Sequence, residues 1–156
     1  MSVEELQQNT FIHNFQESLN KNMDKWDNIV KDLSQKLRNV RDLPDLQAEI
    51  YAKKQDAVEF HTTLVNSMAL RTAAYKKCYA DAYNRYKTAP DHFMRTKTET
   101  AIAKQVDAEM AVDKCIIDMI DVHAKFIDSV ISNLDGIAYG INNRLKIEEI
   151  INSYTA

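Results

Sequence analysis

Apolar residues recur along this chain at steps of three and four, the spacing of one face of an α-helix. In the N-terminal part they are Phe15, Leu19, Met23, Trp26, Val30, Leu33, Leu37 and Val40. This spacing predicts a helix over residues 10–41.

A second apolar pattern predicts a helix over residues 44–88. Pro44 suits the first turn of a helix. The helix is expected to end before Pro90, because proline disfavours helical backbone in the residue that precedes it. The apolar face of this helix includes Leu46, Ile50, Ala57, His61, Leu64, Met68, Tyr75, Tyr79, Ala82 and Tyr86.

The third pattern is a heptad repeat, which is typical of a helix that packs along a partner helix. One core position of the heptad is occupied by Val106, Asp113, Ile120, Ile127, Leu134 and Ile141. The other is occupied by Met110, Ile117, Ala124, Ile131, Ala138 and Leu145. The repeat predicts a helix over residues 97–138. Gly136 and Gly140 predict a break, because glycine costs about 1 kcal/mol in a helix interior. A short C-terminal helix is then expected over residues 142–153.

Two glycines and two prolines in 156 residues leave few places to turn, which disfavours folds with many strands. We therefore expect one all-α domain over residues 1–156. It would consist of a long antiparallel helical hairpin or coiled coil, an additional N-terminal helix and a short C-terminal oligomerisation helix. A rod of this kind leaves helix faces bare, so copies of the chain are expected to cover them. The expected oligomerisation residues are Ile141, Leu145, Ile147, Ile150 and Ile151.

Charge is distributed unevenly along the chain. Eight basic and three acidic residues lie between Arg71 and Lys104, a local charge of +5 in a chain of net charge −3. A basic zone in an acidic protein is typical of a surface that meets a polyanion, although an uneven solvated helix surface has the same composition.

Signals for other classes of protein are missing from the sequence. The N-terminal segment MSVEELQQNT is not a signal peptide, and no apolar run approaches the ~20 residues that span a bilayer. The histidines and cysteines lack metal-ligand spacing, and no phosphate loop or nucleophile motif is present. We expect no catalytic residue, metal or cofactor, no enzymatic activity, no membrane partner, and a cytoplasmic location with reduced cysteines.

The segment YKKCYADAYNRYKT, residues 75–88, combines tyrosines with basic residues and has two readings. Its four tyrosines fall within an arc of about 80° on one helix face, which favours packing on the third helix. The flanking lysine and arginine side chains could also contact the phosphates of a single-stranded nucleic acid, and any exposed tyrosine rings could stack on its bases. The candidate nucleic-acid-binding residues are Lys76, Lys77, Arg85, Lys87, Arg95, Lys97, Tyr83 and Tyr86.

Three segments resemble the UvsY family of bacteriophage recombination mediators, over roughly residues 45–150. They are the tyrosine-rich basic helix end AAYKKCYADAYNRYK, the charged helix start RTKTETAIAKQVDAEM, and the C-terminal run VDKCIIDMIDVHAKFIDSVISNLDGIAYGINNRLKIEEI. In the last of these, an apolar helix leads into Ala138, Tyr139, Gly140 and Ile141 and then a short tail.

The resemblance implies a non-enzymatic protein that binds single-stranded DNA, helps remove single-strand-binding protein and loads a RecA-like recombinase. It also implies ring-shaped homo-oligomers held by C-terminal helices, in the cytoplasm of an infected bacterial host. The resemblance implies that the basic residues with which the family binds DNA correspond to candidates among Lys76, Lys77, Arg85 and Lys87. The alternative is a coiled-coil structural or assembly protein, such as a virion component, scaffold or chaperone, in which the basic zone is only surface.

Overall fold

A computed structural model describes residues 3–37, 43–88 and 98–155, and within these ranges the regular structure is entirely helical. The helices are α1 (Val3–Lys36), α2 (Leu43–Thr88), α3 (Glu99–Glu109) and α4 (Ala111–Thr155). Contacts divide the chain into two compact units. The first comprises Met1–Gln16 and Leu64–Val122, and the second comprises Glu17–Thr63 and His123–Ala156.

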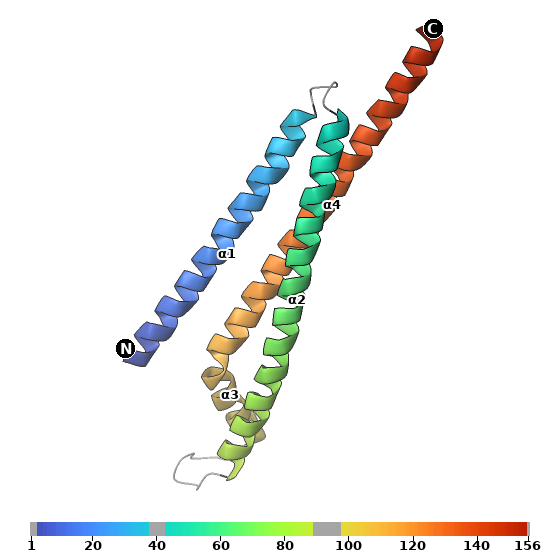
Figure 1. The fold of residues 1–156 in the computed structure, drawn as a ribbon. Helices are drawn as coiled ribbons and strands as arrows, with labels where there is room; N and C mark the ends of the chain where they lie inside the picture. Colours follow the sequence, from blue (N-terminus) through green and yellow to red (C-terminus); the bar gives the residue numbers. More distant parts are fainter. Residues whose placement is uncertain (1–2, 38–42, 89–97, 156) are drawn as a thin grey trace. The chain divides into compact units, whose positions relative to one another are not determined.

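In the second unit, α1, α2 and α4 lie side by side (Figure 1). Gln47 bonds to Asn142 and Lys54 pairs with Asp135, so residue numbers rise along α2 as they fall along α4. The two helices are therefore antiparallel, and the expected all-α fold with a long helical hairpin is confirmed. The core of this unit consists of Trp26, Leu33, Leu43, Leu46, Ile50, Ala57, His123, Ala124, Ile127, Val130, Leu134, Ala138 and Ile141.

In the first unit, α3 lies against the last turns of α2 (Figure 1). Ala82 of α2 is buried with Ile102, Val106 and Met110 of the α3 segment. The side chain of Thr98 caps α3 by accepting a hydrogen bond from the backbone N–H of Ala101 at 3.2 Å. Such a cap satisfies one of the backbone donors that the first turn of a helix leaves free.

The helix expected over residues 97–138 is wrong in one respect, because it is interrupted at Met110. This residue has φ −94° and ψ 5°, outside the α-helical region, and its side chain is buried in the cluster with Ala82. The backbone thus changes conformation where a buried side chain anchors it, without glycine or proline. Residues 89–97, which include the expected start of this helix, lie outside the described residues.

The break expected at Gly136 and Gly140 is also wrong, and so is a separate helix over 142–153. Both glycines lie inside α4, which continues to Thr155. Leu134, Ala138 and Ile141 are buried around them. Full burial of one leucine or isoleucine contributes about 1.5–3 kcal/mol, which offsets the cost of about 1 kcal/mol for each glycine.

The first helix begins at Val3 rather than at residue 10, because the segment VEELQQ consists mostly of good helix formers. It ends at Lys36, and Leu37 already lies in a turn, so the expected end at residue 41 is too late; residues 38–42 lie outside the described residues. The second helix begins at Leu43, one residue before the expected start, and ends at Thr88 as expected. No helix in the described ranges is both long and apolar enough to cross a membrane.

Candidate nucleic-acid interface

The tyrosine face of α2 is a packing surface. Tyr75, Tyr79, Tyr83 and Tyr86 are all partly buried against the cluster of Ala82, Ile102, Val106 and Met110. Tyr75 and Tyr79 also contact each other, with ring centroids 6.0 Å apart. The first interpretation of residues 75–88, in which the tyrosine face packs on a neighbouring helix, is therefore correct for the buried parts of the four rings. The four tyrosines also remain partly exposed.

Two carboxylates of α3 reach this face. Glu109 accepts hydrogen bonds from Arg85, with which it also forms an ion pair, and from the Tyr86 hydroxyl at 3.0 Å. These two donors, Arg85 first, lower the pKa of the Glu109 carboxyl. Partial burial and the neighbouring Asp107 raise the pKa of the Tyr79 hydroxyl. The basic helix end thus has an acidic neighbour that its own sequence does not reveal.

The lysines of the segment are placed differently from Arg85. Lys76, Lys77 and Lys87 are exposed, and no ion pair joins them to any other described residue. At 100° per residue, Lys76, Tyr83 and Lys87 lie within an arc of about 40° on α2, and the two lysines are about 16 Å apart along the helix axis. Lys77 lies about 100° from Lys76. These three lysines, with the partly exposed Tyr83 between two of them, form what we call the lysine track.

The remaining nucleic-acid candidates fall into two groups. Arg85 and Tyr86 are engaged with Glu109, and the Arg85 guanidinium carbon lies 5.4 Å from the centre of the Tyr86 ring. Arg95 and Lys97 lie outside the described residues. The structure therefore leaves Lys76, Lys87 and Tyr83 on one side of α2 and Lys77 on another, all without an ion-pair partner among the described residues, whereas Arg85 and Tyr86 are occupied by Glu109.

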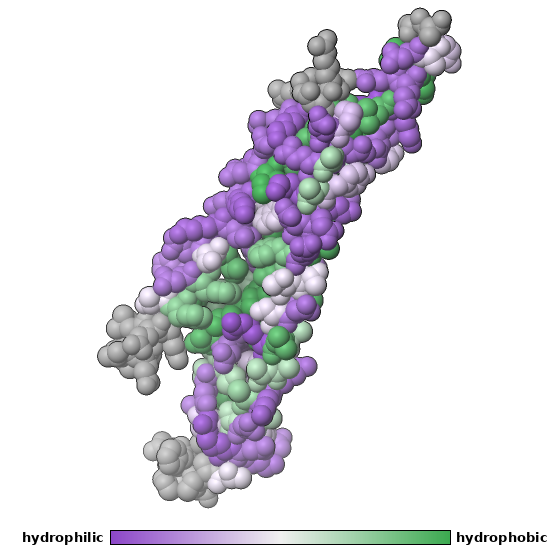
Figure 2. Space-filling model, in the orientation of Figure 1, coloured by the Kyte–Doolittle hydropathy of each residue, from purple (hydrophilic) through white to green (hydrophobic). Residues whose placement is uncertain are grey.

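The candidate oligomerisation residues also differ in exposure. Ile141 is fully buried within the second unit, and Leu145 is half-buried. Ile147, Ile150 and Ile151 are each more than half exposed. Figure 2 shows hydrophobic surface among hydrophilic residues towards the C-terminal end of α4. The exposed apolar side chains of this set therefore begin at Ile147.

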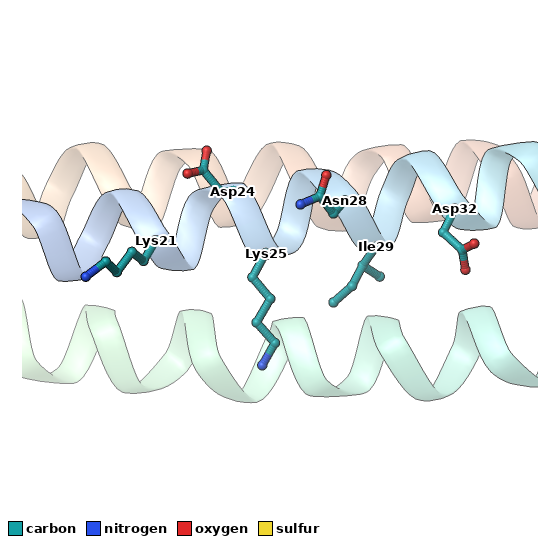
Figure 3. A pocket seen from close by; sticks show the side chains of 6 residues that line it. All are labelled: Lys21, Asp24, Lys25, Asn28, Ile29 and Asp32. Atoms are coloured by element: carbon teal, nitrogen blue, oxygen red, sulfur yellow. The ribbon is translucent and has the colours of Figure 1, made fainter.

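Two surface hollows carry charged residues. One lies in the second unit and is lined by Lys21, Asp24, Lys25, Asn28, Ile29 and Asp32 of α1. Figure 3 shows Lys25 and Ile29 extending towards α2 while Asp24 points away from it. The two lysines and two aspartates balance in charge, and Lys21 already pairs with Glu17 at 2.7 Å. This hollow therefore favours neither anions nor cations.

The other hollow lies in the first unit, with a volume of ≈ 310 Å³. It is lined by Cys78, Asp81, Ala82, Arg85, Glu109 and Met110. Both cysteines are free thiols, and Cys78 is exposed. Among the described residues no group of histidine, cysteine, aspartate and glutamate side chains could hold a metal ion.

Comparison with known proteins adds no relative, since no family model, curated protein or solved structure matches the chain.

Proposed function

We propose that this protein is a single-stranded DNA-binding recombination mediator. In this role it helps load a RecA-like recombinase onto single-stranded DNA that is coated with single-strand-binding protein. The observation that carries the proposal is the lysine track, whose three exposed ammonium groups have no carboxylate partner among the described residues. The sequence resemblance to the UvsY family supports the same assignment.

The lysine track suits a flexible polyanion. Unpaired lysines bind phosphates without first breaking an internal ion pair, and each phosphate contact releases counterions. Tyr83 is half-buried, and the exposed part of its side chain can contact a base; such aromatic contacts tolerate any sequence because every base has a π-face. The track lacks a set of side chains arranged to read base edges, so we expect binding that depends on strandedness more than on sequence.

The apolar end of α4 supports the assembly part of the proposal. An exposed apolar helix face favours association with a second copy, because burial removes that area from water. Several lysine tracks in one oligomer would engage one strand together. The resulting avidity exceeds the affinity of a single subunit without any new contact.

The first test is a binding experiment with the variant Lys76→Ala/Lys77→Ala/Lys87→Ala. Fluorescence anisotropy of a labelled oligonucleotide, single-stranded or double-stranded, is measured across a salt titration. We expect the wild type to prefer the single strand and the variant to bind more weakly. Loss of three phosphate contacts reduces the slope of log affinity against log salt by about two, since each contact contributes about 0.7.

A matched control is Lys25→Ala/Lys31→Ala/Lys114→Ala, which removes the same charge from exposed positions of α1 and α4. It should retain most of the affinity and most of the salt slope. Equal losses in the two triple variants would mean that overall charge governs binding, and the lysine track would lose its role. Absence of binding by the wild type at low salt would favour the coiled-coil assembly protein.

The mediator role itself needs a second measurement. Single-stranded DNA is coated with single-strand-binding protein, a RecA-like recombinase is added, and its DNA-dependent ATP hydrolysis is followed with and without this protein. We expect a shorter lag with the wild type and a longer lag with the lysine-track variant. DNA binding without any effect on the lag would leave a DNA-binding protein that is not a mediator.

A further inference from the structure

Arg85 and Tyr86 are neighbouring donors that converge on one anion. The Arg85 guanidinium bonds to one oxygen of the Glu109 carboxylate, and the Tyr86 hydroxyl bonds to the other at 3.0 Å. The arginine also stacks near the Tyr86 ring, at 5.4 Å from its centre. The two side chains therefore form a two-donor receptor, and the anion bound to it is supplied by α3.

A phosphodiester can make the same two contacts. It carries one negative charge and presents two non-bridging oxygens, as a carboxylate does, and arginine binds either group through its guanidinium N–H donors. The contact is also close to solvent. The side chains of Arg85 and Glu109 are 62% and 36% exposed, so exchange of one anion for another does not open the core.

The adjacent hollow gives an incoming group access to the receptor. Arg85 and Glu109 both line it, with Cys78 and Asp81 beside them. Asp81 disfavours a second phosphate in this hollow, which leaves the receptor as the place for a single one. Lys76 and Lys87 lie on the opposite flank of the tyrosine face, so this contact is separate from those two lysines, whereas Lys77 lies about 80° from Arg85 around the helix.

We propose that Glu109 is an internal competitor that holds Arg85 and Tyr86 in place of a DNA phosphate, so that a bound strand must displace it. The inference rests on the proposed function, because it assigns a second contact and its control to the same DNA-binding helix. Exposed ion pairs are weak, so we expect the competition to lower affinity by about two- to fivefold per site.

The test compares Glu109→Gln with Asp107→Asn, using a labelled oligothymidylate at fixed salt. Both variants remove one negative charge from α3, but only the first releases Arg85. Glutamine keeps the shape of the side chain, and circular dichroism checks that helicity is retained. We expect Glu109→Gln to bind about two- to fivefold more tightly and Asp107→Asn to change affinity less.

A double-mutant cycle with Arg85→Gln separates release of the arginine from a general change in charge. In the Arg85→Gln background the gain from Glu109→Gln should disappear. A gain that persists there, or an equal gain in Asp107→Asn, would overturn the inference.

Alkylation of Cys78 by N-ethylmaleimide gives a readout that does not depend on affinity. In a Cys115→Ser background, bound oligonucleotide should slow this reaction because Cys78 lines the hollow beside Arg85. An unchanged rate under saturating DNA would mean that the strand does not reach the receptor, and the inference would fail.

The two proposals fail in different ways. If the wild type binds DNA through the lysine track but Glu109→Gln has wild-type affinity, only the inference about Glu109 is overturned. If neither the wild type nor any of these variants binds the oligonucleotide at low salt, the proposed function is overturned, and the inference falls with it.

Discussion

His123 is a polar residue in the core of the second unit, with 1% of its side chain exposed. Its Nε2 lies 3.2 Å from the Asn22 side-chain oxygen, and a proton on Nε2 would make this contact a hydrogen bond. Its Nδ1 is buried without a hydrogen-bond partner among the described residues. The rings of Phe60 and Phe126 pack against the imidazole. Burial in these surroundings lowers the pKa of His123.

The lowered pKa predicts loss of stability in mild acid. The unfolded chain, with an ordinary histidine pKa of about 6.5, takes up a proton at a higher pH than the folded chain does. The free energy of unfolding therefore falls as pH decreases from about 6.5 towards the lower folded-state pKa. Thermal melts of the wild type and His123→Phe between pH 7.5 and 5.5 test this. We expect the melting temperature of the variant to fall less.

The control for this experiment is His13→Gln, which changes an exposed histidine of α1. It should keep the pH dependence of the wild type. Equal pH dependence in His123→Phe and the wild type would contradict the prediction and assign the effect to other titratable groups.

At the scale of the element, α4 carries two glycines that its fold does not require. A methyl group added at Gly136 or Gly140 would meet no atom within 4 Å apart from the adjacent backbone of its own helix, and neither glycine has a positive φ. Alanine at each position should stabilise the protein by about 1 kcal/mol, because it reduces the backbone entropy lost on folding. For a chain of this length we expect the melting temperature to rise by about 2–4 °C per substitution.

The comparison should include Ala138→Gly, which places a glycine between the two existing ones and is expected to lower the melting temperature. A fall in melting temperature for Gly136→Ala or Gly140→Ala would indicate that a neighbouring subunit packs against that glycine.

The helical hairpin is predictable from the sequence because its cause is periodic. Ile120, Ile127 and Leu134 recur every seven residues and are buried, and the exposed Asp113 falls in the same row. The interruption at Met110 is not predictable in this way, because it breaks no heptad position and coincides with burial in a tertiary cluster. Glu109 was missed as a site residue for the same reason, since its distance from Arg85 depends on how α3 packs on α2.

The core positions predicted from the sequence also give the wrong burial for two histidines, His61 and His123. His61 lies on the apolar row of α2, where a core position is expected, but it is only half-buried. His123 lies between Ile120 and Ile127 at steps of three and four, and is buried. The spacing of apolar residues in α4 therefore indicated burial of His123, although His123 falls at neither of the two core positions of the heptad repeat.

At the scale of the whole molecule, the end of α4 presents an apolar face that the single chain leaves in water. Ile147, Ile150, Ile151 and Tyr154 follow at steps of three, one and three, so they lie on one side of the helix, and each is at least 55% exposed. Partial burial of each isoleucine against a second copy would contribute on the order of 1 kcal/mol. Such contacts between copies would hold together the oligomer that we propose.

The variant Ile147→Asp/Ile150→Asp tests this assembly. Light scattering coupled to size-exclusion chromatography should give a mass several times 18.0 kDa for the wild type and a mass near 18.0 kDa for the variant. The control Leu70→Asp/Val122→Asp changes two other exposed apolar residues and should keep the wild-type mass.

The dissociated variant should also bind single-stranded DNA more weakly although its lysine track is intact, because avidity is lost. An unchanged mass would exclude the end of α4 as the assembly element, whereas unchanged DNA affinity after dissociation would mean that one track is sufficient for binding.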